Sequence, residues 1–205
     1  MEIVLREYRP EDAPEIVDVF RDACNALRKS RGGAHPDEDI DRFTGKSDAE
    51  LLEILERGAR ITVAEVKGTG RLAGIGAITV DRVARLIGST YSKDHYVREE
   101  FQRGKAGVSV GRMLREATLK AARDMGFRKL YGYSTPEATG FHAKFGAIFH
   151  PGHDSTYMGG VRILYYETEL RKSRLNAIRI EPYVFKIGRF ISQLKLVAEA
   201  RLARR

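Results

Sequence analysis

The residues whose spacing suggests chemistry begin with a glycine-rich stretch, QRGKAGVSVG, in which small residues alternate with valines. Gly107, Ser109 and Gly111 occupy the small positions, and a helical pattern begins at the end of the stretch. Small residues let a ligand approach the backbone, and the free N–H groups of a helix start bind phosphate. Arg103 and Lys105 lie just upstream and are placed to reach the same anion. Taken alone, the stretch is equally consistent with an ordinary strand-to-helix loop.

A second stretch, TPEATGFHAKFGA at 135–147, directly follows an expected strand. With it the sequence resembles the GNAT superfamily of acyl-CoA-dependent N-acyltransferases. In that family a glycine-rich loop opens the central helix, and the next strand leads to the pattern Asn-x-x-Ala-x-x-Phe/Leu-Tyr-x-Lys-Leu/Phe-Gly-Phe. The matching residues are Ala138, Phe141, Lys144, Phe145 and Gly146. The resemblance covers about residues 1–170, because an opening strand followed by RPED is also a familiar beginning in the family.

The resemblance implies a GNAT-like α/β fold, with a mixed, mostly antiparallel central sheet flanked by helices. It implies transfer of an acetyl or other acyl group from acyl-CoA to a primary amine by direct attack, without a metal. In this family the strand that would end near Val97 splays from the next strand and holds the pantetheine arm. Together with the two basic residues above, the expected contacts to acyl-CoA are Val97, Gly107, Val108, Ser109, Val110, Gly111, Arg112 and Thr135.

Four positions depart from the family pattern when the stretch is aligned back from the Met-Gly-Phe that ends the central helix. Ala106 stands where the family has Arg or Gln, and Ser109 stands at the first glycine. Thr135 replaces the usual Asn, and His142 replaces the usual Tyr. The basic residues are displaced upstream, as if the loop held a short insertion.

His142 is the candidate general acid, because the resemblance places position 142 beside the sulfur of the thioester. A histidine with its reference pKa of about 6.5 can donate a proton near neutrality, and such a transfer contributes about 10²–10⁴-fold to the rate. An equal alternative is that His142 only fills space and the thiolate leaves unaided. Asp94 and His95, at the expected end of the splayed strand, are the candidate bases. A water chain is equally acceptable as the base, and exposed polar residues at a strand end are the favoured interpretation of this pair.

Two further groups of polar residues are weaker candidates. The acidic segment HPDEDID at 35–41 would attract a cationic amine, although a solvated acidic loop is the favoured interpretation. His150, His153 and Asp154 have the side chains of metal ligands, but their spacing is not typical of a zinc site, so no metal is expected. Cys24 falls on the apolar face of the first expected helix and is interpreted as a core residue.

The elements that must position these residues follow from the apolar periodicity. Their order is one strand, two helices, a β-meander and then a βαβαβ unit. Strands are expected at 2–8, 60–66, 71–80, 128–134, 147–150 and 161–169, with at least one more inside 83–101, and helices at 13–28, 48–57, 110–125 and 136–145. The helix at 110–125 is expected to bury a face made of Val110, Leu114, Ala117, Ala121 and Met125.

The composition is that of a globular chain of 205 residues, with 42% hydrophobic and 31% charged residues and a net charge of +8. Residues 171–205 hold ten Lys/Arg and two Asp/Glu, which accounts for the whole excess and leaves the first 170 residues neutral. A core that grips nucleic acid is therefore disfavoured. The sequence has a single cysteine, no run of about 18 apolar residues and no secretion signal at its start, so a cytoplasmic protein is expected.

The chain is expected to consist of an acyltransferase-like domain, 1–171, and a basic extension, 172–205, that forms an amphipathic helix from Pro182. The apolar stripe of that helix consists of Tyr183, Val184, Ile187, Phe190, Ile191, Leu194, Val197, Ala198 and Leu202. The favoured partner for the stripe is a second copy of the chain, giving a homodimer. Docking on the chain's own core, on an anionic membrane surface or on an acidic carrier protein are the alternatives.

Two rival functions stay open beside acyl transfer from a short acyl-CoA. The altered loop and the absent Tyr are consistent with a module that binds CoA, or has lost it, without turnover. The same fold is also consistent with a long-chain acyl donor, carried by CoA or by an acidic protein that the basic extension attracts.

Overall fold

The computed structural model describes residues 1–30, 45–105, 107–157, 161–173, 179–184 and 186–187. The chain divides into two compact units, Met1–Lys172 and Ser173–Arg205. In the second unit, residues 181–184 and 186–187 are helical, and the part of the predicted apolar stripe from Phe190 onward lies outside the described residues. The acidic segment at 35–41 also lies outside them. Within the described ranges, no helix has the length and apolar character needed to cross a membrane.

The first unit follows the predicted order of elements. The elements are β1 (Ile3–Glu7), the 3₁₀ turn η1 (Pro10–Asp12), α1 (Ala13–Ser30), α3 (Asp48–Glu56), β2 (Ala59–Val66), β3 (Leu72–Thr79), α4 (Arg82–Ile87), β4 (Ser89–Val97), η2 (Glu99–Gly104), α5 (Val110–Asp124), β5 (Lys129–Ser134), η3 (Pro136–Ala138), α6 (Thr139–Ala143), β6 (Ala147–Phe149), β7 (Ser155–Tyr157) and β8 (Val161–Glu169).

Three elements differ in detail from the sequence-based expectation. The strand expected inside 83–101 is present as β4, but helix α4 precedes it, because Asp81 caps the nitrogen of Ala84 at 2.8 Å and Gly88 ends the helix with a φ of 63°. The helix expected over 136–145 is a 3₁₀ turn followed by the short α6. The segment between the last two expected strands contains β7, which pairs with β8.

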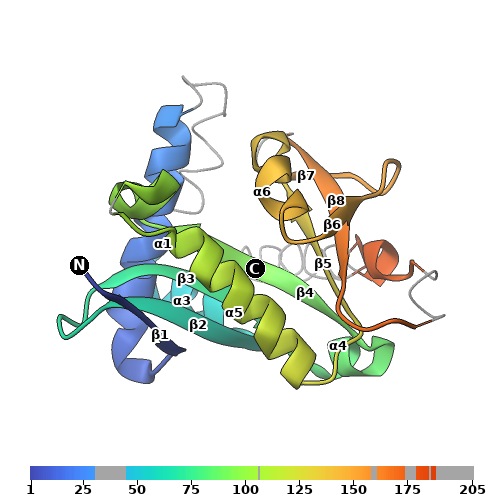
Figure 1. Ribbon diagram of the computed structural model, residues 1–205, viewed down its shortest axis with the longest axis horizontal. Helices are drawn as coiled ribbons and strands as arrows, with labels where there is room; N and C mark the ends of the chain where they lie inside the picture. Colours follow the sequence, from blue (N-terminus) through green and yellow to red (C-terminus); the bar gives the residue numbers. More distant parts are fainter. Residues whose placement is uncertain (31–44, 106, 158–160, 174–178, 185, 188–205) are drawn as a thin grey trace, which may run out of the picture. The chain divides into compact units, whose positions relative to one another are not determined.

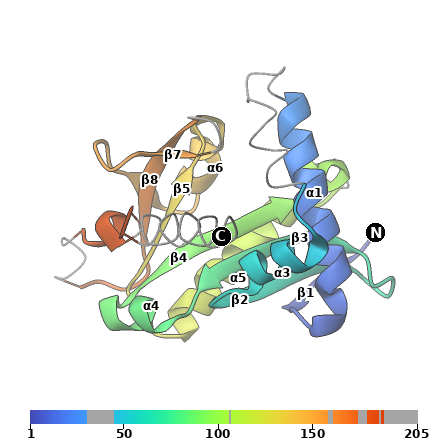
Figure 2. The same ribbon diagram turned by 180° about the vertical axis from the view of Figure 1, so that it is seen from behind.

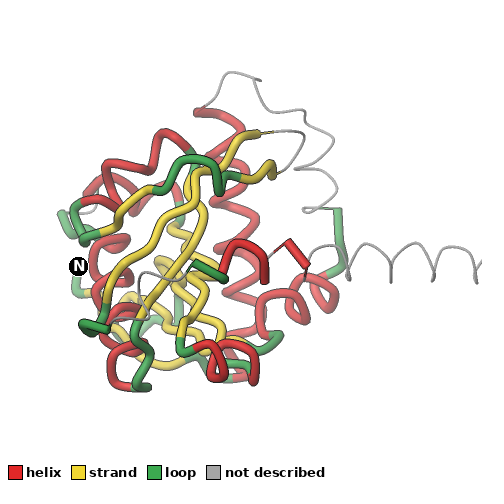
Figure 3. Tube along the Cα trace, turned by 90° about the vertical axis from the view of Figure 1, so that its right-hand side faces the viewer, coloured by secondary structure: helices red, strands yellow, loops and turns green. Residues whose placement is uncertain are grey.

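The strands form one eight-stranded sheet in the order β1-β2-β3-β4-β5-β8-β6, with β7 attached to β8 (Figure 1). All the paired strands are antiparallel except β4 and β5, which are parallel. The predicted mixed, mostly antiparallel sheet is therefore confirmed. Helix α5 covers one face of the β1–β4 half, and α1 with α3 covers the other (Figures 1 and 2). The tube view shows the strands, in yellow, with helices, in red, on both sides of them (Figure 3).

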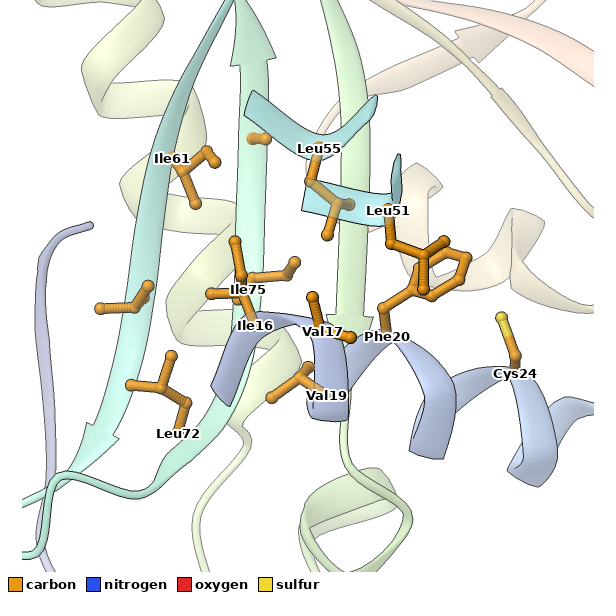
Figure 4. Packing of buried hydrophobic residues seen from close by; sticks show 12 residues of the cluster. Ile16, Val17, Val19, Phe20, Cys24, Leu51, Leu55, Ile61, Leu72 and Ile75 are labelled. Carbon is orange, nitrogen blue, oxygen red and sulfur yellow. The ribbon is translucent and has the colours of Figure 1, made fainter. Parts of the chain in front are cut away.

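A continuous apolar core lies between β2–β4 and the helices α1 and α3 (Figure 4). Phe20 of α1 packs its ring edge against Tyr96 of β4, with 5.0 Å between ring centroids. Cys24 belongs to this core and is buried, which confirms its interpretation from the sequence. The buried members are Ile16, Val17, Val19, Phe20, Cys24, Leu51, Leu55, Ile61, Val63, Leu72, Ile75 and Ala77.

Helix α5 buries a face that is rotated from the expected one. The buried residues are Val110, Leu114, Arg115, Thr118, Leu119 and Ala122, whereas the predicted Ala117, Ala121 and Met125 are only half-buried. The physical reason is that α5 packs on two clusters at once. Val110 and Leu114 contact the cluster over β1–β3, while Leu119 and Ala122 contact the cluster over β5 and β8. The buried face is therefore broad, and it includes an arginine.

A β-bulge interrupts the pairing of β4 with β3 at Lys93. The ammonium group of Lys93 donates to backbone carbonyl oxygens at the C-terminal end of α3, at 3.0 Å from Leu55 O and 3.1 Å from Arg57 O. These carbonyls are among those that a helix end leaves without intrahelical partners. The bulge therefore joins β4 to α3.

We predict that Gly74→Ala destabilises the fold, because the added Cβ would lie 2.7 Å from the backbone oxygen of Tyr96 and 3.0 Å from a methyl group of Leu114. A backbone oxygen inside a sheet has little room to move, so we expect a loss of about 1–3 kcal/mol of unfolding free energy. Chemical denaturation measures the loss. Gly140→Ala is the matched control, because its Cβ would meet no atom within 4 Å. Equal stabilities of the two variants would contradict the prediction.

Candidate functional site

The central feature of the candidate site is the separation of the two parallel strands. β4 and β5 pair over three residues, the last pair being Tyr91 with Tyr131. Beyond that pair, β4 continues over residues 92–97 toward α1, and β5 continues over 132–134 toward α6 (Figure 1). We refer to this divergence as the fork, whose closed end lies at the Tyr91–Tyr131 pair. The splayed strand implied by the family resemblance is thus present, and it ends at Val97 as predicted.

The predicted phosphate loop lies at the start of α5. Ser109 occupies the N-cap position, but its side chain makes no capping hydrogen bond. The first turn of a helix has N–H groups without intrahelical partners, and the side chain of the N-cap residue Ser109 leaves them uncapped. Arg103 and Lys105 are exposed just upstream, and Arg103 has a left-handed φ of 54°, a conformation that costs a non-glycine residue free energy. The loop is therefore an exposed, positively charged approach to an uncapped helix start.

Three elements meet at Gly111 in the first turn of α5. A Cβ at this position would lie 3.8 Å from Cε2 of Phe141 in α6 and 3.8 Å from Cγ2 of Val97 in β4. The structure thus brings the loop-and-helix motif, the end of β4 and the second motif into contact. Arg112, in contrast, points to the surface, where its Nε donates to Glu116 at 2.8 Å.

His95 lies in β4, inside the fork, and its Nε2 is 3.0 Å from the carbonyl oxygen of Gly111. Because a carbonyl only accepts, Nε2 carries the proton and donates it, which leaves Nδ1 unprotonated in the neutral ring. Nδ1 is buried and has no hydrogen-bond partner. Burial, with Arg115 as the second cause, lowers the pKa of His95 to about 4. The residue is thus a neutral imidazole that ties β4 to the start of α5.

His142 lies in α6, and its ring stacks on the ring of Tyr166 in β8, with 4.6 Å between centroids and 24° between planes. Its Nδ1 is buried without a hydrogen-bond partner. Burial, followed by the charge of Arg115 and then by His95, lowers the pKa of His142 to about 3. The ring is therefore uncharged at neutral pH in the ligand-free protein, and the role of proton donor stays a prediction.

Arg115 is the residue of the fork that the sequence analysis did not single out. Its side chain is fully buried, and its guanidinium lies over the ring of Tyr166, with Cζ 5.3 Å from the centroid. It donates to Oγ of Ser92 at 3.2 Å, to the hydroxyl of Tyr166 at 3.4 Å and to Oγ1 of Thr168 at 3.4 Å. The sequence does contain a signal for its burial. Arg115 follows the apolar Leu114, and the positions one helical turn away, Gly111 and Leu119, offer no acidic partner of the kind that a surface arginine often has.

The remaining predicted residues lie at or outside the edge of this arrangement. Thr135 directly follows β5, and its backbone oxygen accepts from Ser134 Oγ at 2.9 Å. Asp94 pairs with Ala77 of β3, and its side chain is not among those described, so its role as a base stays a prediction. Asp154 binds the guanidinium of Arg162 at 2.6 Å. In the described ranges, no three metal-ligating side chains gather in one place.

The comparisons with known proteins find similarity to N-acetyltransferases. No family model matches the sequence. Among curated proteins, the chain is 29% identical over 135 residues to glucosamine 6-phosphate N-acetyltransferase 1 of Oryza sativa subsp. japonica, an alignment that covers 65% of this chain and 78% of that protein.

Several solved structures share the fold. The PaiA N-acetyltransferase of Thermoplasma acidophilum in complex with coenzyme A has a TM-score of 0.61 at 17% identity, covering 82% of this chain and 99% of that one. A GCN5-related N-acetyltransferase of Rhodopseudomonas palustris has a TM-score of 0.63 at 20% identity, covering 82% and 96%. A GNAT phosphinothricin acetyltransferase of Sinorhizobium meliloti in complex with AcCoA has a TM-score of 0.62 at 18% identity, covering 85% and 91%. The chain has the GNAT fold, and the resemblance predicted from its sequence is confirmed.

The neutral histidines of the fork predict how stability depends on pH. Their pKa values of about 4 and about 3 lie below the ordinary 6.5, so the unfolded chain binds more protons as the pH falls below 6.5. We therefore expect the free energy of unfolding to drop between pH 6.5 and 4, by up to about 1.4 kcal/mol per pH unit for each histidine.

Urea unfolding at pH 7, 5.5 and 4.5 tests this dependence. The decrease in unfolding free energy should be smaller in His95→Gln and in His142→Gln than in the parent chain. The control is His153→Gln, at a position between β6 and β7 and outside the fork. This variant should keep the pH dependence of the parent's unfolding free energy. The same slope in all four proteins would show that the two buried rings do not cause it.

Proposed function

We propose that this protein transfers an acyl group from acyl-CoA to a primary amine, with acetyl as the simplest donor group. The observation that carries the proposal is the junction at Gly111, where the uncapped start of α5 opens onto the fork between β4 and β5. A phosphate-binding helix start and an unpaired strand edge are the two features that a long ligand with a phosphate end and an amide-containing arm requires. The acetyltransferase names of the similar proteins support the same reading.

In this proposal each part of the ligand has its own residues. The N–H groups of residues 110–112, with the exposed Arg103 and Lys105, bind the pyrophosphate. The backbone groups of residues 92–97 hydrogen-bond the amides of the pantetheine arm, because they have no strand partner on the β5 side among the described residues. The thioester then lies deeper in the fork, among the side chains of α5, α6 and β8.

The chemistry requires two proton movements. The neutral amine attacks the carbonyl carbon of the thioester, the C–S bond breaks, the new amide nitrogen loses a proton and the thiolate gains one. His142 is our candidate donor to the thiolate. Because a thiolate beside the ring favours its charged form, it would raise the pKa of His142 from the low value of the ligand-free state. His95 and Asp94 remain the candidate bases, with a water chain as the alternative.

The acceptor and the assembly are also matters of proposal. The name of the rice relative suggests an amino sugar phosphate as one acceptor to test, beside other primary amines. We keep the homodimer formed through residues 172–205 and the cytoplasmic location as proposals. The rival reading, a module that binds CoA without turnover, differs from ours in one measurement, the release of free thiol from acetyl-CoA with a panel of amines.

We predict that Gly111→Glu weakens CoA binding, because it places a carboxylate at the helix start where the pyrophosphate would bind. Calorimetric titration with CoA should show an affinity at least about tenfold lower, since like charges and lost N–H contacts both oppose binding. Gly111→Ala is the matched control, because its Cβ would make only ordinary contacts at 3.8 Å. Unchanged affinity of the Glu variant would move the phosphate site elsewhere.

We predict that His142→Phe lowers kcat by about 10²-fold or more, with a smaller change in KM for acyl-CoA, because a proton donor acts in the transition state. His142→Tyr should retain activity, since Tyr is the usual residue of the family at this place. Initial rates of thiol release across pH 6–9 compare the three proteins. If the Phe variant equals the parent throughout this range, His142 serves packing alone.

A further inference from the structure

Arg115 is a buried charge whose hydrogen-bond partners in the described part of the chain are all neutral. Its guanidinium contacts three hydroxyl groups, on Ser92, Tyr166 and Thr168, at 3.2–3.4 Å. These distances are at or beyond the long end of the range for N–H···O bonds. Its Nε makes no hydrogen bond, and no described carboxylate lies within ion-pair distance. Since a buried cation ordinarily has an anionic partner, this part of the fork lacks a negative charge.

The guanidinium lies at the closed end of the fork. Ser92 is the first residue of β4 beyond the last pair with β5. Tyr166 is paired with Gly132, the first residue of β5 beyond the same point. Arg115 therefore bridges the two sides of the fork where they begin to separate. A ligand that enters at the start of α5 and runs between the strands would bring its far end toward this group.

A second buried atom without a partner lies near Arg115. It is Nδ1 of His142, whose ring stacks on the same Tyr166 that accepts a hydrogen bond from Arg115, and the charge of Arg115 acts on this ring. Buried polar atoms are nearly always hydrogen-bonded, so the unused Nε–H of Arg115 indicates a ligand group that accepts hydrogen bonds there. Because the nearby charge is positive, an anion satisfies it best.

We propose that Arg115 determines the specificity for the acyl donor, and that the preferred donor is a CoA thioester of a short acyl chain that ends in a carboxylate, such as malonyl or succinyl. This inference rests on the proposed function. A carboxylate can accept two parallel hydrogen bonds from a guanidinium, and the unused Nε of Arg115 supplies one of them. A methyl-terminated chain at the same place leaves the buried charge without a partner.

The other anionic groups of acyl-CoA are accounted for elsewhere. The phosphates belong at the start of α5, where exposed cations and free N–H groups are available. The departing thiolate is common to every donor, so an arginine that served only the thiolate would not distinguish one acyl chain from another. An arginine that binds the acyl carboxylate favours only the donors that carry one, whereas an arginine that binds the thiolate favours all donors equally.

Calorimetric binding to the full-length protein tests the inference without knowledge of the amine acceptor. The ligands are CoA, acetyl-CoA and two pairs matched in chain length, malonyl-CoA with propionyl-CoA and succinyl-CoA with butyryl-CoA. We expect at least one carboxylate-bearing member to bind tenfold or more tightly than its neutral partner. Arg115→Met should reduce that ratio to within about twofold and leave the affinity for CoA unchanged, while Arg115→Lys should keep part of the preference.

Arg123→Met is the matched control, because it removes an exposed positive charge from the last turn of the same helix. Arg123→Met should keep the parent's ratio of affinities for the carboxylate-bearing and neutral donors. If the parent binds both members of each pair equally, the inference is wrong and the proposed function stands. If Arg115→Met weakens all donors by the same factor, Arg115 serves a part common to them and the inference is also wrong. If no CoA compound binds, both the inference and the proposed function fail. Even if Arg115→Met does not fold, the ratio of the two affinities within each matched pair, measured with the parent protein, tests the inference.

Discussion

The loss of pairing between β4 and β5 after Tyr91 and Tyr131 is the constraint on which the rest of the structure depends. A sheet interior normally satisfies backbone groups on both sides of each strand, but among the described strands β4 has a neighbour on only one side over residues 92–97. The opening is closed by other elements: α5 brings its first turn against Val97, and α6 adds Phe141. The fold thus creates an edge in the middle of a sheet and surrounds it with side chains.

Electrostatics within the fork follow from that enclosure. Burial lowers the pKa of His95 and of His142, and the charge of the Arg115 guanidinium lowers both pKa values further, so both rings are neutral. The start of α5 adds its partial positive charge at the other end of the same opening. Two positive sources, at the closed end of the fork and at the start of α5, favour a ligand that is anionic at both ends.

The sequence was informative where a pattern repeats or a motif has fixed spacing. The order of elements followed from such signals, and the splay ending near Val97 was implied by the family resemblance that the motifs carry. Helix α4 is too short for a period to be visible, so only the cap at Asp81 and the glycine at 88 marked it. Arg115 was not found because apolar periodicity counts an arginine as a surface residue, and its burial depends on the tertiary contacts of a helix that packs on two clusters at once.

The bulge at Lys93 lets two nearby side chains of β4 reach the helices on opposite faces of the sheet. An ammonium group has three N–H donors, and here they face the carbonyls of Ile54, Leu55 and Arg57 at the end of α3. Two positions further along β4, His95 binds the first turn of α5 on the opposite face. One strand therefore holds a helix on each face of the sheet, α3 through Lys93 and the first turn of α5 through His95.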